Sequence, residues 1–243
     1  MKKILFCVGV FDDKDYRYEI FNNQIKKRNE DYCLYHGFEY LHITEIPIFR
    51  DHYSWSRIKL ANELISQMGD GDILANIDAD MCIVDGKEPF ITKKSFAYSI
   101  DTGNSHCLGN WTLRVNHWSR NLLHNLIDDK IYNLISDSEL VKMWKEQGIL
   151  YHIFGIKNPL TDDSHFLCDI NKMNYAYMEQ DYGFRLYEIS ELIENIEVLS
   201  SDWNVPYLPG DRYFICKHDS LIIRHWSGGQ IWDKNLYNNP IKF

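Results

Sequence analysis

Apolar runs of strand length alternate with helical stripes over the N-terminal third of the chain. Residues 4–10 form a continuous apolar run with β-branched side chains, residues 38–43 would be the second strand, and the apolar run at 73–77 would be the third. Between the runs, mostly apolar and aromatic side chains recur every three or four positions over 18–35 and 55–68, and a glycine follows each stripe. This period marks one face of a helix, and the glycine favours helix termination. The order β-α-β-α-β predicts an open, mostly parallel sheet covered by helices.

The rest of the chain carries shorter signals. Strands are expected at 96–100, 111–115 and 221–224. Helices are expected after a cap at Ser119, over 139–147 with a stop at Gly148, over 163–169 and over 188–197. The sequence has no repeat, low-complexity tract or linker. The predicted fold is therefore α/β, one domain over 1–243 with a mostly parallel open sheet flanked by helices and a mixed C-terminal part.

Composition and charge exclude several classes of partner. The net charge is −9, which makes nucleic acid and anionic membranes poor partners. Nothing in the sequence reaches about 18 consecutive apolar residues, so no membrane span is expected. The six cysteines are scattered without metal-binding spacing, as expected of buried free thiols in a reducing compartment. The first apolar run is too short for a signal peptide and acidic residues follow it, so a cytoplasmic location is expected.

The apolar run at 73–77 ends in two carboxylates, Asp78 and Asp80. In an extended segment, side chains two positions apart lie on the same face, so both carboxylates are expected to point the same way. Two ionised carboxylates held together repel each other unless a cation joins them. A hard divalent cation such as Mg²⁺ or Mn²⁺ takes oxygen ligands and commonly bridges to phosphates. Ligands of open α/β sheets bind at the carboxyl ends of strands, where these two residues are expected to lie.

A second acidic cluster follows in the C-terminal half. Asp162 and Asp163 precede a serine and a histidine. Asp163 suits a helix N-cap, and it equally suits a carboxylate that binds a substrate hydroxyl or stabilises developing positive charge.

Two further groups are candidates for metal and phosphate contacts. His225 follows an apolar run and precedes Gly228 and Gly229, and histidine is a common metal ligand while glycines allow close backbone approach to a phosphate. Arg57 and Lys59 in the second predicted helix suit a diphosphate, although a solvated helix face explains them as well.

Together these pieces resemble a family of metal-dependent glycosyltransferases, the retaining galactosyl- and xylosyltransferases with one nucleotide-binding α/β domain of the GT-A fold. The similarity runs from about Trp55 to Gln230 and preserves the order of the family's motifs. The matching segments are Trp55-Ser56-Arg57, Asp78-Ala79-Asp80, Leu113-Arg114-Val115-Asn116-His117-Trp118-Ser119, Asp162-Asp163-Ser164 and His225-Trp226-Ser227-Gly228-Gly229-Gln230. Two positions depart from the pattern: Gln230 stands where the family has a lysine, and Ser164 stands where it has a glutamine.

The resemblance implies a role for each matched residue. Asp78, Asp80 and His225 would hold Mn²⁺ or Mg²⁺. Contacts to the nucleotide sugar would come from Arg57, Asp78, Val10, Phe11, Gly228 and Gln230. Asp162 and Asp163 would be the catalytic carboxylates where sugar and acceptor meet. Residues 1–85 would form the nucleotide-binding half and 86–243 the acceptor-binding half.

The reaction that this resemblance implies moves a hexose or pentose from a nucleotide sugar to a saccharide or glycoconjugate, with retention and with UDP as the expected nucleotide. The metal would act as a Lewis acid on the departing diphosphate. Three alternatives stay open. A nucleotidyltransferase would need a Gly-rich basic loop after the first strand, and residues 9–17 are acidic with one glycine. A non-catalytic sugar- or nucleotide-binding protein needs only the aromatic side chains, and a glycosidase would use two facing carboxylates.

Overall fold

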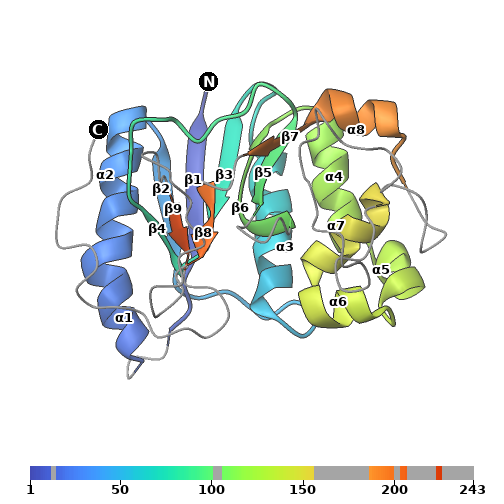
Figure 1. Cartoon of the computed structure of the whole chain (residues 1–243), viewed down its shortest axis with the longest axis horizontal. Helices are drawn as coiled ribbons and strands as arrows, with labels where there is room; N and C mark the ends of the chain where they lie inside the picture. Colours follow the sequence, from blue (N-terminus) through green and yellow to red (C-terminus); the bar gives the residue numbers. More distant parts are fainter. Residues whose placement is uncertain (12–14, 101–105, 156–185, 200–202, 207–222, 226–243) are drawn as a thin grey trace.

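The computed structural model of the chain contains two sheets, and helices cover both faces of the larger one (Figure 1). The structure describes residues 1–11, 15–100, 106–155, 186–199, 203–206 and 223–225. The predicted helix at 163–169 therefore lies outside the described residues, as do Asp162, Asp163, Gly228 and Gln230.

The large sheet has six strands in the order β2-β1-β3-β6-β5-β7. In that order their bounds are Glu39–Ile43, Lys3–Val8, Ile73–Ile77, His106–Arg114, Phe96–Ile100 and Ile196–Leu199. All pairs are parallel except those of β6, which runs antiparallel to both β3 and β5. Only residues 101–105 separate β5 from β6, and so short a connection joins antiparallel strands, because a parallel crossover needs a dozen residues or more. The predicted mostly parallel α/β sheet is thus confirmed, with β6 as its reversed strand.

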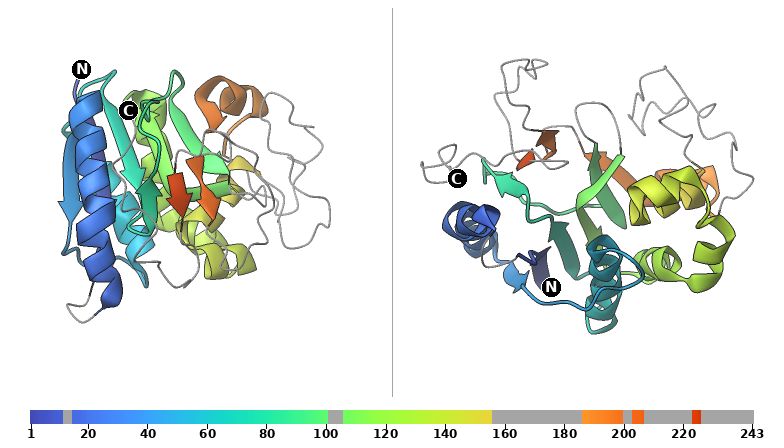
Figure 2. Two further views of the ribbon diagram at one scale, coloured as in Figure 1. Left: turned by 60° about the vertical axis from the view of Figure 1, so that its left-hand side comes forward. Right: turned by 90° about the horizontal axis from the view of Figure 1, so that it is seen from below.

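One face of the sheet is covered by the first long helical segment (Figure 2). Leu5 and Cys7 of β1 point to this face and pack with α1 (Tyr16–Ile20), the π-helical turn η1 (Phe21–Lys26) and α2 (Lys27–His36). The three segments run on without interruption, as the stripe over 18–35 predicts. Gly37 ends α2 with φ at 70°, a left-handed conformation that costs glycine little, so the predicted stop is confirmed.

The opposite face carries the remaining helices. Ile4 and Phe6 of β1 pack there, because side chains alternate along a strand. The bounds of these helices are Tyr53–Ser66 for α3, His117–Ile127 for α4, Asp129–Ile135 for α5, Glu139–Trp144 for α6, Glu146–Phe154 for α7 and Ile189–Asn195 for α8. In the part of the chain that the structure describes, no helix is long and apolar enough to cross a membrane.

Three predicted helix ends are wrong. The helix expected over 188–197 ends at Asn195, because Ile196 begins β7. The N-cap of α4 is Asn116, and Ser119 is the third helical residue, which completes a capping box with it. The helix expected over 139–147 breaks at Lys145 and resumes as α7, so Gly148 lies inside a helix instead of ending one. A Cβ atom at Gly148 would lie 2.4 Å from the carbonyl oxygen of Leu140, so this glycine permits close packing of α7 on α6.

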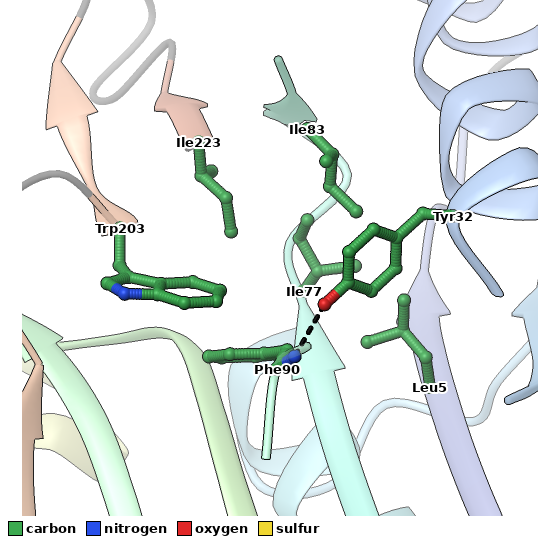
Figure 3. Close-up of a pocket in the computed structure, with 7 residues that line it drawn as sticks. All are labelled: Leu5, Tyr32, Ile77, Ile83, Phe90, Trp203 and Ile223. Atoms are coloured by element: carbon green, nitrogen blue, oxygen red, sulfur yellow. Dashed lines mark hydrogen bonds between the residues drawn. The ribbon is translucent and has the colours of Figure 1, made fainter. Parts of the chain in front are cut away.

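A second, small sheet has the order β4-β9-β8, with bounds Met81–Ile83, Ile223–His225 and Val205–Pro206. Seven apolar or aromatic side chains enclose a small cavity between this sheet, α2 and the large sheet (Figure 3). Phe90 stacks on Trp203 across it, with ring centroids 4.9 Å apart. The Tyr32 hydroxyl accepts a hydrogen bond from the Phe90 amide and donates one to the Glu88 carbonyl at 2.8 Å. The hydrogen bonds tie the segment after β4 to α2, and the shared lining of the cavity packs the small sheet against the large one.

The predicted burial of the cysteines is confirmed for three of the four that the structure describes. Cys7, Cys33 and Cys82 are buried free thiols, and Cys107 is half-buried. Burial raises the pKa of each of the three buried thiols to about 12, so they stay protonated near neutral pH. Cys168 and Cys216 lie outside the described residues.

Candidate functional site

The carboxyl ends of β1, β2 and β3 meet at one edge of the sheet, because these three strands are parallel neighbours. The amide of Gly9 donates to the Ile43 carbonyl at 2.9 Å, so the chain after β1 still follows β2. A Cβ atom at Gly9 would lie 3.4 Å from that of Ala79. Val10 and Phe11, two of the predicted nucleotide contacts, therefore continue from a point beside the Asp78–Asp80 segment. The sheet brings these three strand ends together as the sequence predicts.

The Asp78–Asp80 segment is a turn. The amide of Met81 donates to the Asp78 carbonyl at 3.0 Å, and the amide of Asp78 donates to the Gly109 carbonyl of β6 at 2.8 Å. The extended backbone ends at Ile77, so strand alternation does not govern the directions of the two carboxylates. Both aspartates are half-buried. A turn between two hydrogen-bonded anchors fixes their backbone at the sheet edge.

Arg57 of α3 links the site to its surroundings through two ion pairs. Its guanidinium donates to the carboxylate of Asp78 and, through Nη2, to Oε1 of Glu146 at 2.6 Å. Arg57 is 6% exposed, which rules out the solvated helix face. Lys59, by contrast, is exposed, with its ammonium 5.0 Å from the centroid of the Phe49 ring. Of the two cations considered in the sequence, only Arg57 belongs to the site.

Glu146 is the site residue that sequence reasoning missed. It is the first residue of α7, a helix whose nine residues are all buried, and it is 4% exposed. Because the sequence predicts a helix over 139–147 that stops at Gly148, Glu146 is expected in the polar last turn of that helix. The available signal was the run after it: from Gly148 to Phe154 no residue is Asp, Glu, Lys or Arg. A helix that is apolar on all sides is buried, and a carboxylate at its start then needs a cationic partner.

The formal charges of Arg57, Asp78 and Glu146 give the cluster a net negative charge, which attracts a cation. Asp78 and Glu146 contribute two negative charges and Arg57 one positive, so the trio sums to −1, and Asp80 adds a further negative charge nearby. The pKa of Cys7, raised mainly by burial, is raised further by Asp80 and lowered by Arg57. The pKa of Arg17 is raised mainly by its hydrogen bonds to Asp15 and slightly by Asp80. Asp80 thus acts electrostatically on both the end of β1 and the start of α1.

Pairing of β9 with β4 places the backbone of His225 next to the aspartate turn. β9 pairs with β4 in antiparallel register, and Met81 lies opposite His225. Met81 follows Asp80 directly, so the backbone of His225 lies one position along from Asp80, the last residue of the turn, across the β4–β9 pair. The structure does not describe the side chain of His225. It also does not describe the other site residues predicted in the C-terminal part, Asp162, Asp163, Gly228 and Gln230.

Carboxylate oxygens suit a hard divalent cation, and the excess negative charge at the turn is consistent with one. Asp78 is also engaged by Arg57, which compensates part of its charge. Among the side chains that the structure describes, no three His, Cys, Asp or Glu residues come together as a metal site. Asp78 and Asp80 are the predicted metal ligands whose side chains the structure describes, and the metal site with His225 as its third ligand stays a prediction.

No protein-family model and no curated protein matches this sequence. Among solved structures, the chain is similar to a glycosyltransferase involved in the glycosylation of the major capsid of PBCV-1, with a TM-score of 0.51, 10% identity and 94% of each chain covered. The galactosyltransferase LgtC in complex with donor and acceptor sugar analogues gives a TM-score of 0.39 at 12% identity, covering 93% of this chain and 87% of that one. Drosophila β1,4-galactosyltransferase 7, solved with manganese, UDP-Gal and xylobiose, gives 0.33 at 14% identity over 52% of each chain.

The first of these similarities identifies the fold. A single α/β domain with a mostly parallel sheet, flanked by helices, is shared with that glycosyltransferase over nearly the whole chain. The activity has to be argued from the site itself, because folds host many functions.

Proposed function

We propose that this chain is a metal-dependent glycosyltransferase that moves a hexose or pentose from a UDP-linked sugar to a saccharide or glycoconjugate acceptor, with retention. The observation that carries the proposal is the Asp78–Asp80 turn at the carboxyl edge of β1, β2 and β3, tied to the buried Arg57 and Glu146. This is the edge at which open α/β sheets bind ligands. The fold that the chain shares with a solved glycosyltransferase also supports the proposal.

In this proposal Asp78, Asp80 and His225 would hold Mn²⁺ or Mg²⁺, which would neutralise the departing diphosphate as a Lewis acid. Arg57 and Glu146 hold the Asp78 carboxylate in one orientation before any ligand arrives, because the guanidinium is clamped between two carboxylates. Such preorganisation lowers the cost of arranging charge around the transition state. Val10, Phe11, Gly228 and Gln230 are the proposed contacts to the nucleotide sugar.

The division of labour along the chain belongs to the same proposal. Residues 1–85 carry the strand ends and the aspartate turn and would bind the nucleotide. Residues 86–243 would bind the acceptor, with Asp162 and Asp163 lining the point where sugar and acceptor meet. Glu146 belongs to this second half and pairs with Arg57 of the first half, which would place it where the two proposed halves adjoin.

The test is thermal stabilisation by UDP, with and without Mn²⁺, in the wild type and in Asp80→Ala. At a ligand concentration of about 100 times Kd, binding stabilises the folded state by about 2.7 kcal/mol. We expect a metal-dependent rise in Tm that Asp80→Ala abolishes and that Asp70→Ala, an exposed aspartate outside the site, retains. The absence of any shift with UDP, GDP or CDP under either metal would overturn the proposal in favour of a sugar-binding protein.

A further inference from the structure

The junction between α6 and α7 is a single residue, Lys145, in an unusual backbone conformation. Lys145 is at once the C-cap of α6 and the N-cap of α7, with φ at 54° and ψ at −125°. Positive φ in a residue with a side chain is strained, and it persists only where the surroundings hold it. The strained residue lies directly before Glu146.

Helix α3 and the segment before it contact both residues of this junction. The ammonium of Lys145 lies 2.9 Å from Oδ2 of Asp51, two residues before α3, and Oε1 of Glu146 lies 2.6 Å from Nη2 of Arg57. Asp51 also accepts a hydrogen bond from Nε1 of the buried Trp55 at 3.1 Å, which fixes its carboxylate against α3. Lys145 and Glu146, which are adjacent and of opposite charge, are thus each paired with an opposite charge. Arg57, the partner of Glu146, is in α3, and Asp51, the partner of Lys145, lies just before it.

The next two residues fix the junction from the other sides. Oε1 of Gln147 accepts a hydrogen bond from the Leu108 amide of β6 at 3.0 Å. Gly148 packs directly on the backbone of α6, with no room for a Cβ atom. Leu108 precedes Gly109, whose carbonyl accepts from the Asp78 amide. The junction is therefore tied to α3, to α6 and to the strand that holds the aspartate turn.

Among these ties, the ion pair between Asp51 and Lys145 is the one nearest solvent. The Asp51 side chain is 59% exposed and that of Lys145 28%, against 5% for Glu146. The Asp51 carboxylate nevertheless has two fixed partners, and its pKa is lowered mainly by the hydrogen bond from Lys145. If this pair is broken, Lys145 loses one of the ties that hold its strained conformation, and a rotation there would change the direction in which the next side chain leaves the backbone.

We propose that Lys145, held by Asp51, is a positioning residue that keeps Glu146 against Arg57 and so keeps the Asp78 carboxylate oriented for the transfer. The inference rests on the proposed function for its consequence on turnover. Its structural content is that the Arg57 environment depends on a pair of side chains that do not themselves touch Arg57. Displacing a preorganised group by about 1 Å costs on the order of 100-fold in rate.

The experiment uses the full chain with Asp51→Asn, Lys145→Met and the charge exchange Asp51→Lys with Lys145→Asp. The control is Lys142→Met in α6, whose partner Asp137 is 3.5 Å away and fully exposed. The first readout is independent of activity: the Nε–Hε NMR signal of Arg57 in protein labelled with ¹⁵N-arginine, assigned by its loss in Arg57→Lys. We expect this signal to shift or broaden in both single variants, to return toward its wild-type position in the charge exchange, and to stay unchanged in the control.

The second readout is kinetic. With a UDP-sugar and Mn²⁺, we expect kcat to fall at least tenfold in both single variants while KM for the donor changes less than threefold, with partial recovery in the charge exchange. An unchanged Arg57 signal in Asp51→Asn and Lys145→Met would overturn the positioning role whatever the kinetics. A wild type that neither binds UDP nor transfers sugar would overturn the proposed function alone, because the NMR comparison still decides the positioning.

Discussion

The buried ion pair of Arg57 with Glu146 gives the sharpest prediction for stability. Arg57 is 6% exposed and Glu146 4%, and each is the other's charge partner at 2.6 Å. Removing one member of such a pair leaves the other charge buried, which typically costs about 3–5 kcal/mol. We therefore expect Arg57→Met to lower the free energy of unfolding by about 3–5 kcal/mol. Glu146→Leu should cost about 1–3 kcal/mol, because the guanidinium keeps Asp78 as a partner.

The double variant Arg57→Met with Glu146→Leu separates this explanation from simple loss of packing. Replacing a buried ion pair by apolar side chains of similar volume is often close to neutral. Removing both side chains still leaves Asp78 without its guanidinium, so the double variant keeps part of the loss, and we expect it to be about 2–3 kcal/mol more stable than the sum of the two single losses predicts. Urea unfolding at pH 7, followed by far-UV circular dichroism, measures all four proteins of the cycle. Losses that add within about 0.5 kcal/mol would refute the buried pair, since independent sites add to that accuracy.

Three further predictions follow from close contacts and burial. Gly148→Ala should lower the free energy of unfolding by about 1–3 kcal/mol, because its Cβ atom would lie 2.4 Å from the Leu140 carbonyl oxygen, and a neutral urea midpoint would contradict this. Gly109→Ala places a Cβ atom 2.5 Å from Cε of Met81 and 3.0 Å from Oδ2 of Asp78, so both side chains must shift and we expect weaker metal-dependent UDP binding in a titration, with a far-UV spectrum like that of the wild type. Burial lowers the pKa of His152, so the unfolded chain binds more protons below about pH 6.5 and the free energy of unfolding falls as pH drops through that range. His152→Gln should flatten this slope between pH 7 and 5, and an equal slope would show that His152 does not contribute.

The first half of the fold could be predicted from the sequence because its signals are local. Burial on both faces makes a parallel strand a continuous apolar run, as at residues 4–8, and an amphipathic helix repeats its apolar face every three or four residues. The strand ends then follow from topology: parallel strands that are neighbours end at one edge, which placed the aspartates of the turn beside the chain after β1.

The second half was harder to predict because tertiary contacts override the local signals there. A glycine after a helical stripe indicates a stop, and at Gly37 the left-handed conformation confirms it. Gly148 instead lies inside a helix, where glycine is needed because the backbone of α6 leaves no room for a side chain. Sequence spacing alone does not distinguish these two uses of glycine.

The sequence by itself determined the α/β class, the first three strands and the position of two carboxylates at a strand end, because each depends on residues close together in the chain. Only the tertiary structure decided that Arg57 is buried and that Glu146, 89 residues away, is its partner. The physical reason is that both the burial of Arg57 and the identity of its partner depend on which helices pack together, and contacts between residues far apart in the chain decide that packing.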